Sequence, residues 1–339
     1  MTRFFHKITR SIVAAATIVA AAMGLYSCSL VNDDLDPCPQ GVVLRFVYDY
    51  NMEFANAFPP QVDCLTLLVY DQAGNYVKTV TETSSVLADE NWRMTIDLPA
   101  GQKYHFVAYG GLECSKSSFH FVNTPAAGSS LTSLQVAMDA NCIGADPGVD
   151  LHPLFFGDLD LAIPANALDY VEATVYMLRD TNSIRILLEN VDGTPVNPAD
   201  FNFAITADNT LMAYNNDVVP TPEGITYSPW VTGQNSVGST DKGDLVTLAY
   251  AEFSVARLID EAPVRLNITN ANTGLKVLSI PLVNYLLLLK SERYKNMPAQ
   301  EYLDRENHWD IILFLQEGKW LDTHIVINDW TVRINNAEL

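Results

Sequence analysis

The sequence predicts a mainly all-β protein made of two tandem β-sandwich domains, with one or two short helices. Short runs of β-branched and aromatic residues recur along the chain, with turn-forming residues between them. The length of 339 residues suits about two domains at ~150 residues each. Hydrophobic residues make up 48% of the chain and charged residues 18%, a globular balance that excludes disorder along the whole length.

The first strand is expected at residues 42–50, where Leu44, Phe46 and Tyr48 alternate with Arg45, Val47 and Asp49 and so share one buried face. Residues 71–75 supply turn chemistry and predict a hairpin. The strands of this first half are expected at 42–50, 65–70, 76–83, 92–98, 103–109 and 131–138.

A polar stretch at 141–153 and the segment Ile163-Pro164-Ala165-Asn166 mark the expected domain boundary. We therefore predict sandwiches at 38–164 and 165–339. Pro298 suits the first position of a helix over 299–306, which we expect to pack against the core. The strands of the second half are expected at 171–178, 183–189, 201–206, 245–254, 264–269, 275–280, 309–315, 324–327 and 330–334, with a hairpin turn at 270–274.

The first 27 residues are predicted to be a signal peptide, because a basic start precedes a short apolar run over 12–23. Leu25-Tyr26-Ser27-Cys28 resembles a bacterial lipobox, which implies acylation of Cys28 and attachment to outer-membrane lipid. The alternative is ordinary cleavage nearby, with Cys28 as an unrelated thiol. Residues 28–37 form an acidic tether, which suggests either an export signal to the outer face of the outer membrane or a solvated linker.

The chain is acidic, with 40 Asp and Glu against 20 Lys and Arg and a net charge of −20. Loss of residues 1–27 removes three basic and no acidic side chains, so the charge becomes −23. A nucleic-acid partner is therefore not expected, because binding to phosphate backbones depends on cationic side chains. Membrane attachment would depend on the lipid rather than on basic contacts with headgroups.

Four cysteines remain after Cys28, and an even number in an oxidising compartment permits two disulfides. Their pairing is left open, as is the alternative of buried free thiols; they are Cys38, Cys64, Cys114 and Cys142. Their spacing and the scattered histidines match no zinc site. The spacing of Asp146, Asp150, Asp158 and Asp160 matches no calcium loop, so a solvated acidic loop is favoured there.

The common catalytic motifs are missing from the sequence. The chain contains no G-x-S-x-G elbow, phosphate-binding Gly-rich loop or H-E-x-x-H pair. We expect no enzyme activity, no catalytic residues, no metal and no cofactor.

Several segments, in order along the chain, resemble the fimbrial anchor and minor fimbrillin family of Bacteroidia. The C-terminal resemblance lies in 300–306, 309–315, 317–320 and 325–330, with Ile325-Val326-Ile327-Asn328-Asp329-Trp330 at its end. The N-terminal resemblance lies in Cys28, 36–39, 42–51 and 69–76, and the middle is similar at 109–111, 154–157 and 178–185.

The resemblance implies two transthyretin-like sandwiches and a lipid-anchored fimbrial subunit that binds stalk subunits by β-strand exchange at the outer membrane, facing the cell surface. Such a subunit would attach the fimbria and limit its length. The candidate donor or docking strand is the tail, with Ile325, Ile327, Trp330, Val332 and Ile334 as its residues. The alternative is that this tail pairs within its own domain.

Two features bear on the role within a fimbria. Stalk members of the family are cleaved after a basic residue, and Lys116 is the only basic residue between 115 and 165, which favours an anchor. The alternatives are a tip or accessory adhesin, for which Trp230 is a candidate contact, and a surface glycan-binding lipoprotein, for which the five tryptophans single out no platform.

Overall fold

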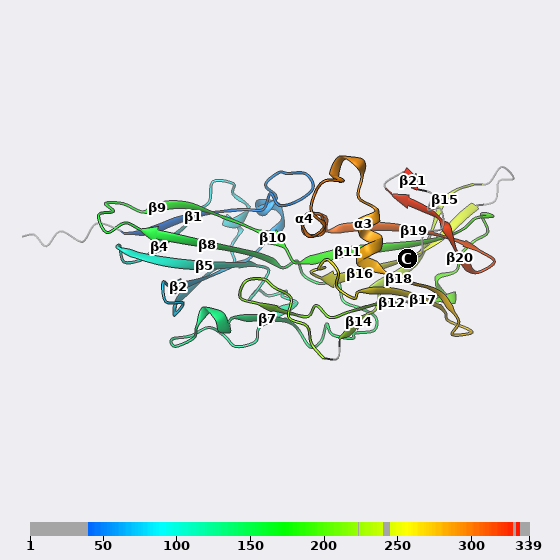
Figure 1. Ribbon diagram of the computed structural model, residues 1–339, viewed down its shortest axis with the longest axis horizontal. Coiled ribbons are helices and arrows are strands. Elements are labelled where there is room, and N and C mark those ends of the chain that lie inside the picture. Colours follow the sequence, from blue (N-terminus) through cyan, green and yellow to red (C-terminus); the bar gives the residue numbers. More distant parts are fainter. Residues whose placement is uncertain (1–39, 223, 240–244, 328–329, 333–339) are drawn as a thin grey trace, which may run out of the picture.

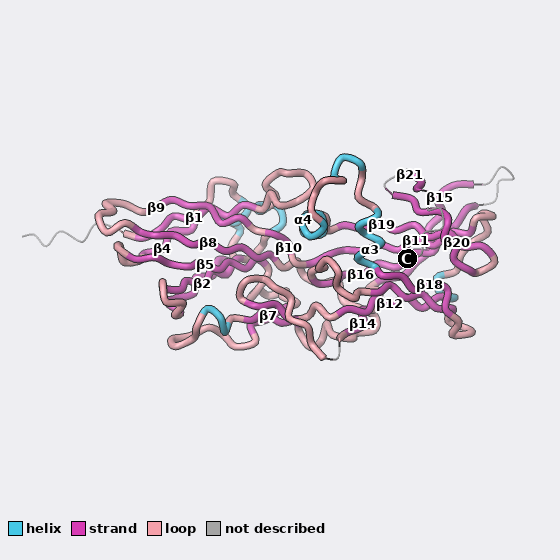
Figure 2. Tube along the Cα trace, viewed as in Figure 1, coloured by secondary structure: helices cyan, strands magenta, loops and turns pink. Residues whose placement is uncertain are grey.

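The structure is a computed structural model that describes residues 40–222, 224–239, 245–327 and 330–332. The protein is elongated and mostly β, with the first sandwich at one end and the second at the other (Figure 1). Strands dominate both halves, and the few helices lie in short connections (Figure 2). The predicted fold class is confirmed; the transthyretin-like assignment stays a prediction.

The first sandwich pairs a three-stranded sheet with a five-stranded sheet. The smaller sheet has the order β4-β1-β9, with Met94–Asp97, Gly41–Val47 and Val171–Tyr176. The larger has the order β10-β8-β5-β2-β3, with Leu178–Arg179, Phe155–Ile163, Gln102–Gly110, Leu65–Asp71 and Tyr76–Glu82. The alternation predicted for β1 holds, since Leu44, Phe46 and Tyr48 are buried between the sheets.

The second sandwich is built in the same way from a larger and a smaller sheet. The six-stranded sheet has the order β15-β16-β11-β19-β20-β21, with Val231–Ser239, Leu245–Ala256, Thr181–Asn190, His308–Gln316, Lys319–Ile327 and Trp330–Val332. The four-stranded sheet has the order β14-β12-β17-β18, with Ile225–Tyr227, Phe201–Ala207, Arg265–Asn270 and Lys276–Pro281.

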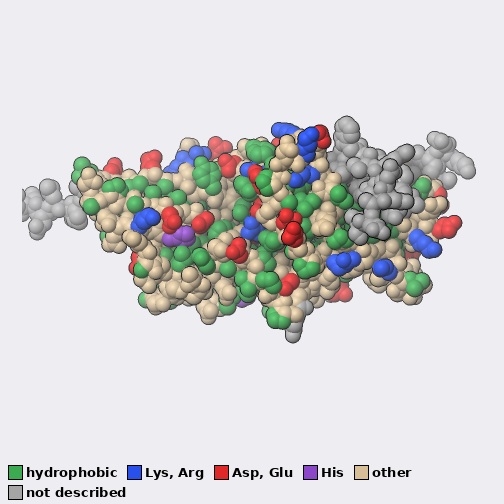
Figure 3. Space-filling view, viewed as in Figure 1, with side chains coloured by type: hydrophobic (Ala, Val, Ile, Leu, Met, Phe, Trp, Pro, Cys, Tyr) green, Lys and Arg blue, Asp and Glu red, His purple; other side chains and the backbone are tan. Residues whose placement is uncertain are grey.

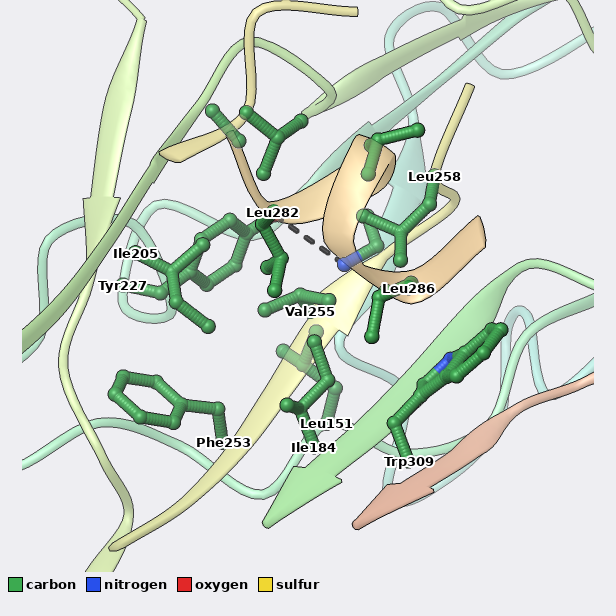
Figure 4. Close-up of a cluster of buried hydrophobic side chains, with 14 of the residues drawn as sticks. Leu151, Ile184, Ile205, Tyr227, Phe253, Val255, Leu258, Leu282, Leu286 and Trp309 are labelled. Atoms are coloured by element: carbon green, nitrogen blue, oxygen red, sulfur yellow. Dashed lines mark hydrogen bonds between the residues drawn. The ribbon is translucent and has the colours of Figure 1, made fainter. Parts of the chain in front are cut away.

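Short helices complete the fold. They are α2 (Phe58–Gln61), α3 (Leu282–Leu288), α4 (Ala299–Arg305) and the 3-10 turns Ser85–Ala88, Leu131–Ser133, Pro198–Asp200 and Glu292–Tyr294. Leu282 and Leu286 of α3 point into the second core, toward Ile184 and Val255 of the large sheet (Figure 4). The predicted helix at 299–306 is confirmed as α4, which buries Tyr302 and Leu303.

A separate three-stranded sheet, β13-β7-β6, joins the two halves of the chain, with Leu211–Ala213, Gln135–Met138 and Phe119–Phe121. Leu68, Tyr70, Val107 and Tyr109 project from the outer face of the five-stranded sheet into the same hydrophobic cluster as the second sandwich. The outer face of the first sandwich therefore shares a hydrophobic core with the second sandwich, whereas the core between the first sandwich's own two sheets is a separate cluster.

The expected domain boundary at 164/165 differs from the observed strand pairing. β9 pairs in parallel with β1, with Val42 opposite Val171 and Val47 opposite Tyr176, and β10 pairs with β8. Residues 171–179 therefore belong to the first sandwich, and the sheet membership changes at Asp180. The predicted strand at 131–138 is also only half correct, because a 3-10 turn precedes β7.

Candidate functional site

The two ends of the described chain lie in different sandwiches, far apart along the long axis of the molecule. β1 begins at Gly41 at the outer end of the first sandwich, whereas β20 and β21 lie in the second sandwich, toward the other end (Figure 1). Cys28, the predicted lipidation site, lies outside the described residues and precedes Gln40 by twelve positions. No helix within the described residues is long and apolar enough to span a membrane.

The C-terminal tail pairs within its own sheet. In β20, Ile325 lies opposite Leu313 of β19. In β21, Val332 lies opposite Ile325 and Trp330 lies opposite Ile327. β21 is the last strand of this sheet in the described part of the chain. Ile334, the remaining candidate of the tail, lies outside the described residues. This pairing corresponds to the internal alternative, and it also places the tail at a sheet edge, where strands can be added.

The junction between the sandwiches contains a buried polar cluster around Asp180. Its backbone N–H donates to the carbonyl of Leu154 (2.7 Å), and Asn216 Nδ2 donates to its Oδ1 (2.8 Å). Arg257 Nε lies 3.8 Å from the same oxygen. Burial raises the pKa of Asp180 to about 7, although the positive charge of Arg257 and the hydrogen bond from Asn216 oppose the shift.

The same arginine links this cluster to α4. Arg257 donates from Nε to Asp304 Oδ1 (2.9 Å) and from Nη2 to Oδ2 (2.8 Å), a bidentate pair. Its Nη1 donates to the backbone carbonyl of Asn216 (2.6 Å). Gln300 of α4 also donates to Asp304 Oδ1 (2.9 Å). These bonds fix α4 against Arg257, which follows β16, and tie Arg257 to the loop that carries Asn216.

Arg305 fastens the other side of α4 to the first sandwich. Its guanidinium lies 4.0 Å from the ring centroid of Tyr50 and 4.6 Å from that of Phe54, in the loop after β1. Its Nε donates to Glu301 Oε1 (2.8 Å). Nearby, Asn307 Nδ2 donates to the hydroxyl of Tyr48 (2.7 Å). The junction is therefore held by directional contacts in addition to the shared core.

The cysteines within the described residues have two different environments. Cys64 and Cys114 form a disulfide, with their Cα atoms 6.1 Å apart. Cys142 is buried as a free thiol. Cys38 lies outside the described residues. Asp63 lies beside the disulfide sulfurs, but sulfurs bonded to each other are not thiolate ligands, so this group is not a metal centre.

The acidic residues considered for calcium lie apart. Asp160 pairs with His105 Nδ1 (2.9 Å) on the first sandwich, and Asp150 lines a groove on the second. Over the described residues, these four aspartates form no metal-ligand group. On the face shown in Figure 3, basic and acidic side chains of the described chain are interspersed.

Trp230 lies at a groove on the second sandwich. The groove has a volume of about 310 Å³ and also contains Arg185, Glu252 and Asp310. Sequence reasoning singled out Trp230 but not these charged neighbours. They come from three different strands and are brought together only by sheet register.

The described residues form an elongated, mainly β molecule in which the two sandwiches pack together and the six-stranded sheet ends in β21. The family model for fimbrillin-A associated anchor proteins Mfa1 and Mfa2 matches residues 35–336. The chain belongs to this family of fimbria-associated proteins, which implies association with fimbrial subunits and with the cell surface or outer membrane. No curated protein matches the chain.

Solved structures agree with this family. A candidate adhesin from Bacteroides thetaiotaomicron is 50% identical, with a TM-score of 0.83, and the match covers 89% of this chain and 100% of that one. A candidate polysaccharide-binding protein from the same organism is 29% identical, with a TM-score of 0.75, covering 87% and 98%. The fimbrial anchor protein Mfa2 from Porphyromonas gingivalis is 16% identical with a TM-score of 0.65, covering 87% and 99%, and shows the shared fold.

Proposed function

We propose that this protein is a lipid-anchored fimbrial subunit that attaches a fimbria to the outer membrane through acylated Cys28, facing the cell surface. The observation that carries the proposal is the family match over residues 35–336, together with a lipobox-like Leu25-Tyr26-Ser27-Cys28 ahead of it. The acyl chains would supply the membrane affinity, since each buried methylene contributes ~0.8 kcal/mol. The acidic chain has no excess of basic residues to do so.

The geometry supports membrane attachment through the first sandwich and binding of a stalk subunit through the second. The tether from Cys28 leads to β1 at the outer end of the first sandwich, and twelve residues of extended chain span at most ~40 Å. The tail strands β20 and β21 belong to the second sandwich. A membrane-bound first sandwich would therefore direct the second sandwich and its tail away from the bilayer, toward a stalk subunit.

The contact with the stalk subunit would use strand exchange or strand addition at the tail. β21 has three residues and pairs with β20 alone among the described residues, so its backbone pairing is limited. A strand from a stalk subunit could pair beside it, or the tail could leave its edge position and enter the partner. In both cases the main-chain ladder supplies affinity and the alternate side chains supply register.

Lipid attachment is tested by replacing Cys28 with Ala in cells that make the fimbria, with Ser27→Ala as the matched control that keeps the thiol. We expect the Cys28→Ala variant to release fibres into the medium and to alter their length, while the control leaves them attached. Attached fibres of unchanged length in the Cys28→Ala strain would refute the anchoring role.

The tail is tested by deleting residues 330–339 and measuring co-purification with the stalk subunit. A shorter deletion of 335–339 is the matched control, because it keeps Trp330, Val332 and Ile334. We expect only the longer deletion to abolish co-purification. Equal recovery of the stalk subunit with both variants would exclude the tail as the docking strand.

A further inference from the structure

The groove beside Trp230 has the features of a ligand site that anchoring does not require. It lies on the outward face of the six-stranded sheet, and its volume of about 310 Å³ is at the lower end of the ~300–1,000 Å³ typical of small-molecule sites. Its side chains come from three adjacent strands and two loops: Asp150, Arg185, Trp230, Glu252, His308 and Asp310.

The floor of the groove is a row of charged side chains set by strand register. Arg185 of β11 lies opposite Glu252 of β16 on one side and opposite Asp310 of β19 on the other. Arg185 Nε and Nη2 lie 2.8 and 2.6 Å from a single oxygen, Glu252 Oε1. This pair therefore does not use Glu252 Oε2 or Arg185 Nη1. With the arginine side chain 51% exposed, these atoms can form hydrogen bonds to a ligand.

The aromatic wall is fixed in place by backbone contacts. Trp230 is 36% exposed, and its backbone N–H donates to the carbonyl of Glu252 (2.9 Å), so the indole borders the charged row. The preceding residue, Pro229, accepts a hydrogen bond from the N–H of Gly148 (3.0 Å). Gly148 is required there, because a Cβ would lie 1.9 Å from the carbonyl oxygen of Ser228.

The Gly148 contact also positions the opposite wall. Asp150 follows Gly148 by two residues, so the loop that carries this carboxylate is tied to the loop that carries Trp230. Burial raises the pKa of Asp150, which agrees with a position inside the groove rather than in open solvent. Both walls are therefore formed before a ligand binds.

We propose that this groove binds a neutral saccharide of one or two hexose rings. The C–H face of a sugar ring can pack on the partly exposed Trp230, while neighbouring hydroxyl groups bind the carboxylate of Glu252 and the guanidinium of Arg185. The carboxylates of Asp150, Glu252 and Asp310 outnumber the two guanidiniums, that of Arg185 in the groove and that of Arg179, whose charge opposes the rise in the pKa of Asp150. This balance disfavours sialylated, sulfated or uronic sugars. This binding activity goes beyond membrane anchoring and does not depend on Cys28.

The test uses the mature chain with Cys28→Ala, so that it stays in solution, and measures binding by calorimetry and tryptophan fluorescence. The probes are maltose, cellobiose, lactose and mannobiose, with sialyllactose as the anionic comparison. We expect at least one neutral probe to bind, and Trp230→Ala and Glu252→Gln each to weaken it by about tenfold or more. Tyr176→Ala is the matched control, since this aromatic is 63% exposed on β9 of the first sandwich.

Trp230→Phe is the control for misfolding. It keeps an aromatic face at this position, so it should retain most of the affinity for the saccharide. The proposal fails if no neutral probe binds below about 10 mM, if Trp230→Ala binds like the parent, or if sialyllactose binds best. Fimbrial attachment is measured in cells through Cys28, so a negative result here leaves the anchoring proposal intact, and failure of anchoring leaves this site intact.

Discussion

Replacing Asp180 by Asn should make the protein more stable at alkaline pH, because the carboxylate of Asp180 is buried at the junction between the sandwiches. Its side chain is fully buried, and its pKa rises from 3.8 to about 7 in the folded state. Asp180 Oδ2 and Asn216 Oδ1 are both buried without a hydrogen-bond partner. A proton on Asp180 Oδ2 would allow this hydroxyl to donate to Asn216 Oδ1, which completes a carboxylic acid–amide pair.

The sign and size of the effect follow from proton linkage. Because the pKa is higher in the folded state, the folded protein holds a proton between pH 3.8 and about 7 that the unfolded chain has lost. Stability from this group is therefore complete below pH 3.8 and declines as the pH rises through this window. At ~1.36 kcal/mol for each pH unit, the loss amounts to about 4 kcal/mol. The side-chain amide introduced by Asp180→Asn is neutral at every pH, and it can donate to Asn216 Oδ1.

We expect Asp180→Asn to match the parent near pH 4 and to exceed it by up to about 4 kcal/mol at pH 8. The assay is urea unfolding of the mature, disulfide-bonded chain at both pH values. Asp304→Asn is the control: it deprives Arg257 of its bidentate partner and should destabilise the protein by about 3–5 kcal/mol at both pH values. The same pH dependence in Asp180→Asn and the parent would refute this reasoning.

Two further predictions concern a contact between α4 and the first sandwich and a disulfide within the first sandwich. Arg305→Ala should destabilise the protein by about 1–2 kcal/mol, because the guanidinium stacks on Tyr50 and Phe54, and Arg305→Lys should recover only part of this loss. Thermal unfolding of both variants measures the effect. An Arg305→Ala variant as stable as the parent would contradict the prediction. Removing the Cys64–Cys114 disulfide with a Cys64→Ser, Cys114→Ser double variant should lower the free energy of unfolding by about 2–4 kcal/mol, because the disulfide closes a loop with a sequence separation of 50. A reductant should lower the unfolding midpoint of the parent and leave that of the double variant unchanged.

Elements with local chemistry could be predicted from the sequence. The hairpin at 71–75 forms as expected, because Asp71 Oδ1 accepts the N–H groups of Ala73 (2.9 Å) and Asn75 (2.8 Å), and Gly74 takes a positive φ of 78°. The turn at 270–274 closes in a similar way, with Asn270 Oδ1 accepting the N–H of Asn272 (3.0 Å). In both cases the signals lie within five consecutive residues.

Elements that depend on distant partners could not be predicted. β15 contains Gly233, Gln234 and Asn235, which have little β-propensity. Tertiary contacts hold it: the amide of Gln234 donates to the carbonyl of Val196 (2.7 Å), and the ring of Tyr250 lies close over Gly233. The sequence does not indicate helix α3, because Pro281 interrupts the apolar stretch in which the helix lies. In the structure Pro281 is the N-cap of α3.

The same distinction between local signals and distant partners applies to the groove beside Trp230. Trp230 could be singled out as one residue, but Arg185 and Glu252 meet across a separation of 67 residues through the pairing of β11 with β16. Asp180 gives no signal in the sequence, because its burial results from the meeting of two sandwiches. The sheet membership of β9 depends on the same kind of contact, because β9 pairs with β1, more than a hundred residues earlier in the chain.

The polar contacts at the junction and the shared hydrophobic core contribute differently to the way the two sandwiches are held together. Apolar packing is strong but non-directional, so it holds two sandwiches together without fixing their angle. The stacking of Arg305 on Tyr50 and the hydrogen bond from Asn307 to the hydroxyl of Tyr48 join the second half of the chain to the first sandwich, and both depend on orientation. If the protein acts as the proposed anchor, with a membrane tether at one end and a fibre at the other, this fixed angle would set the direction in which the fibre leaves the surface.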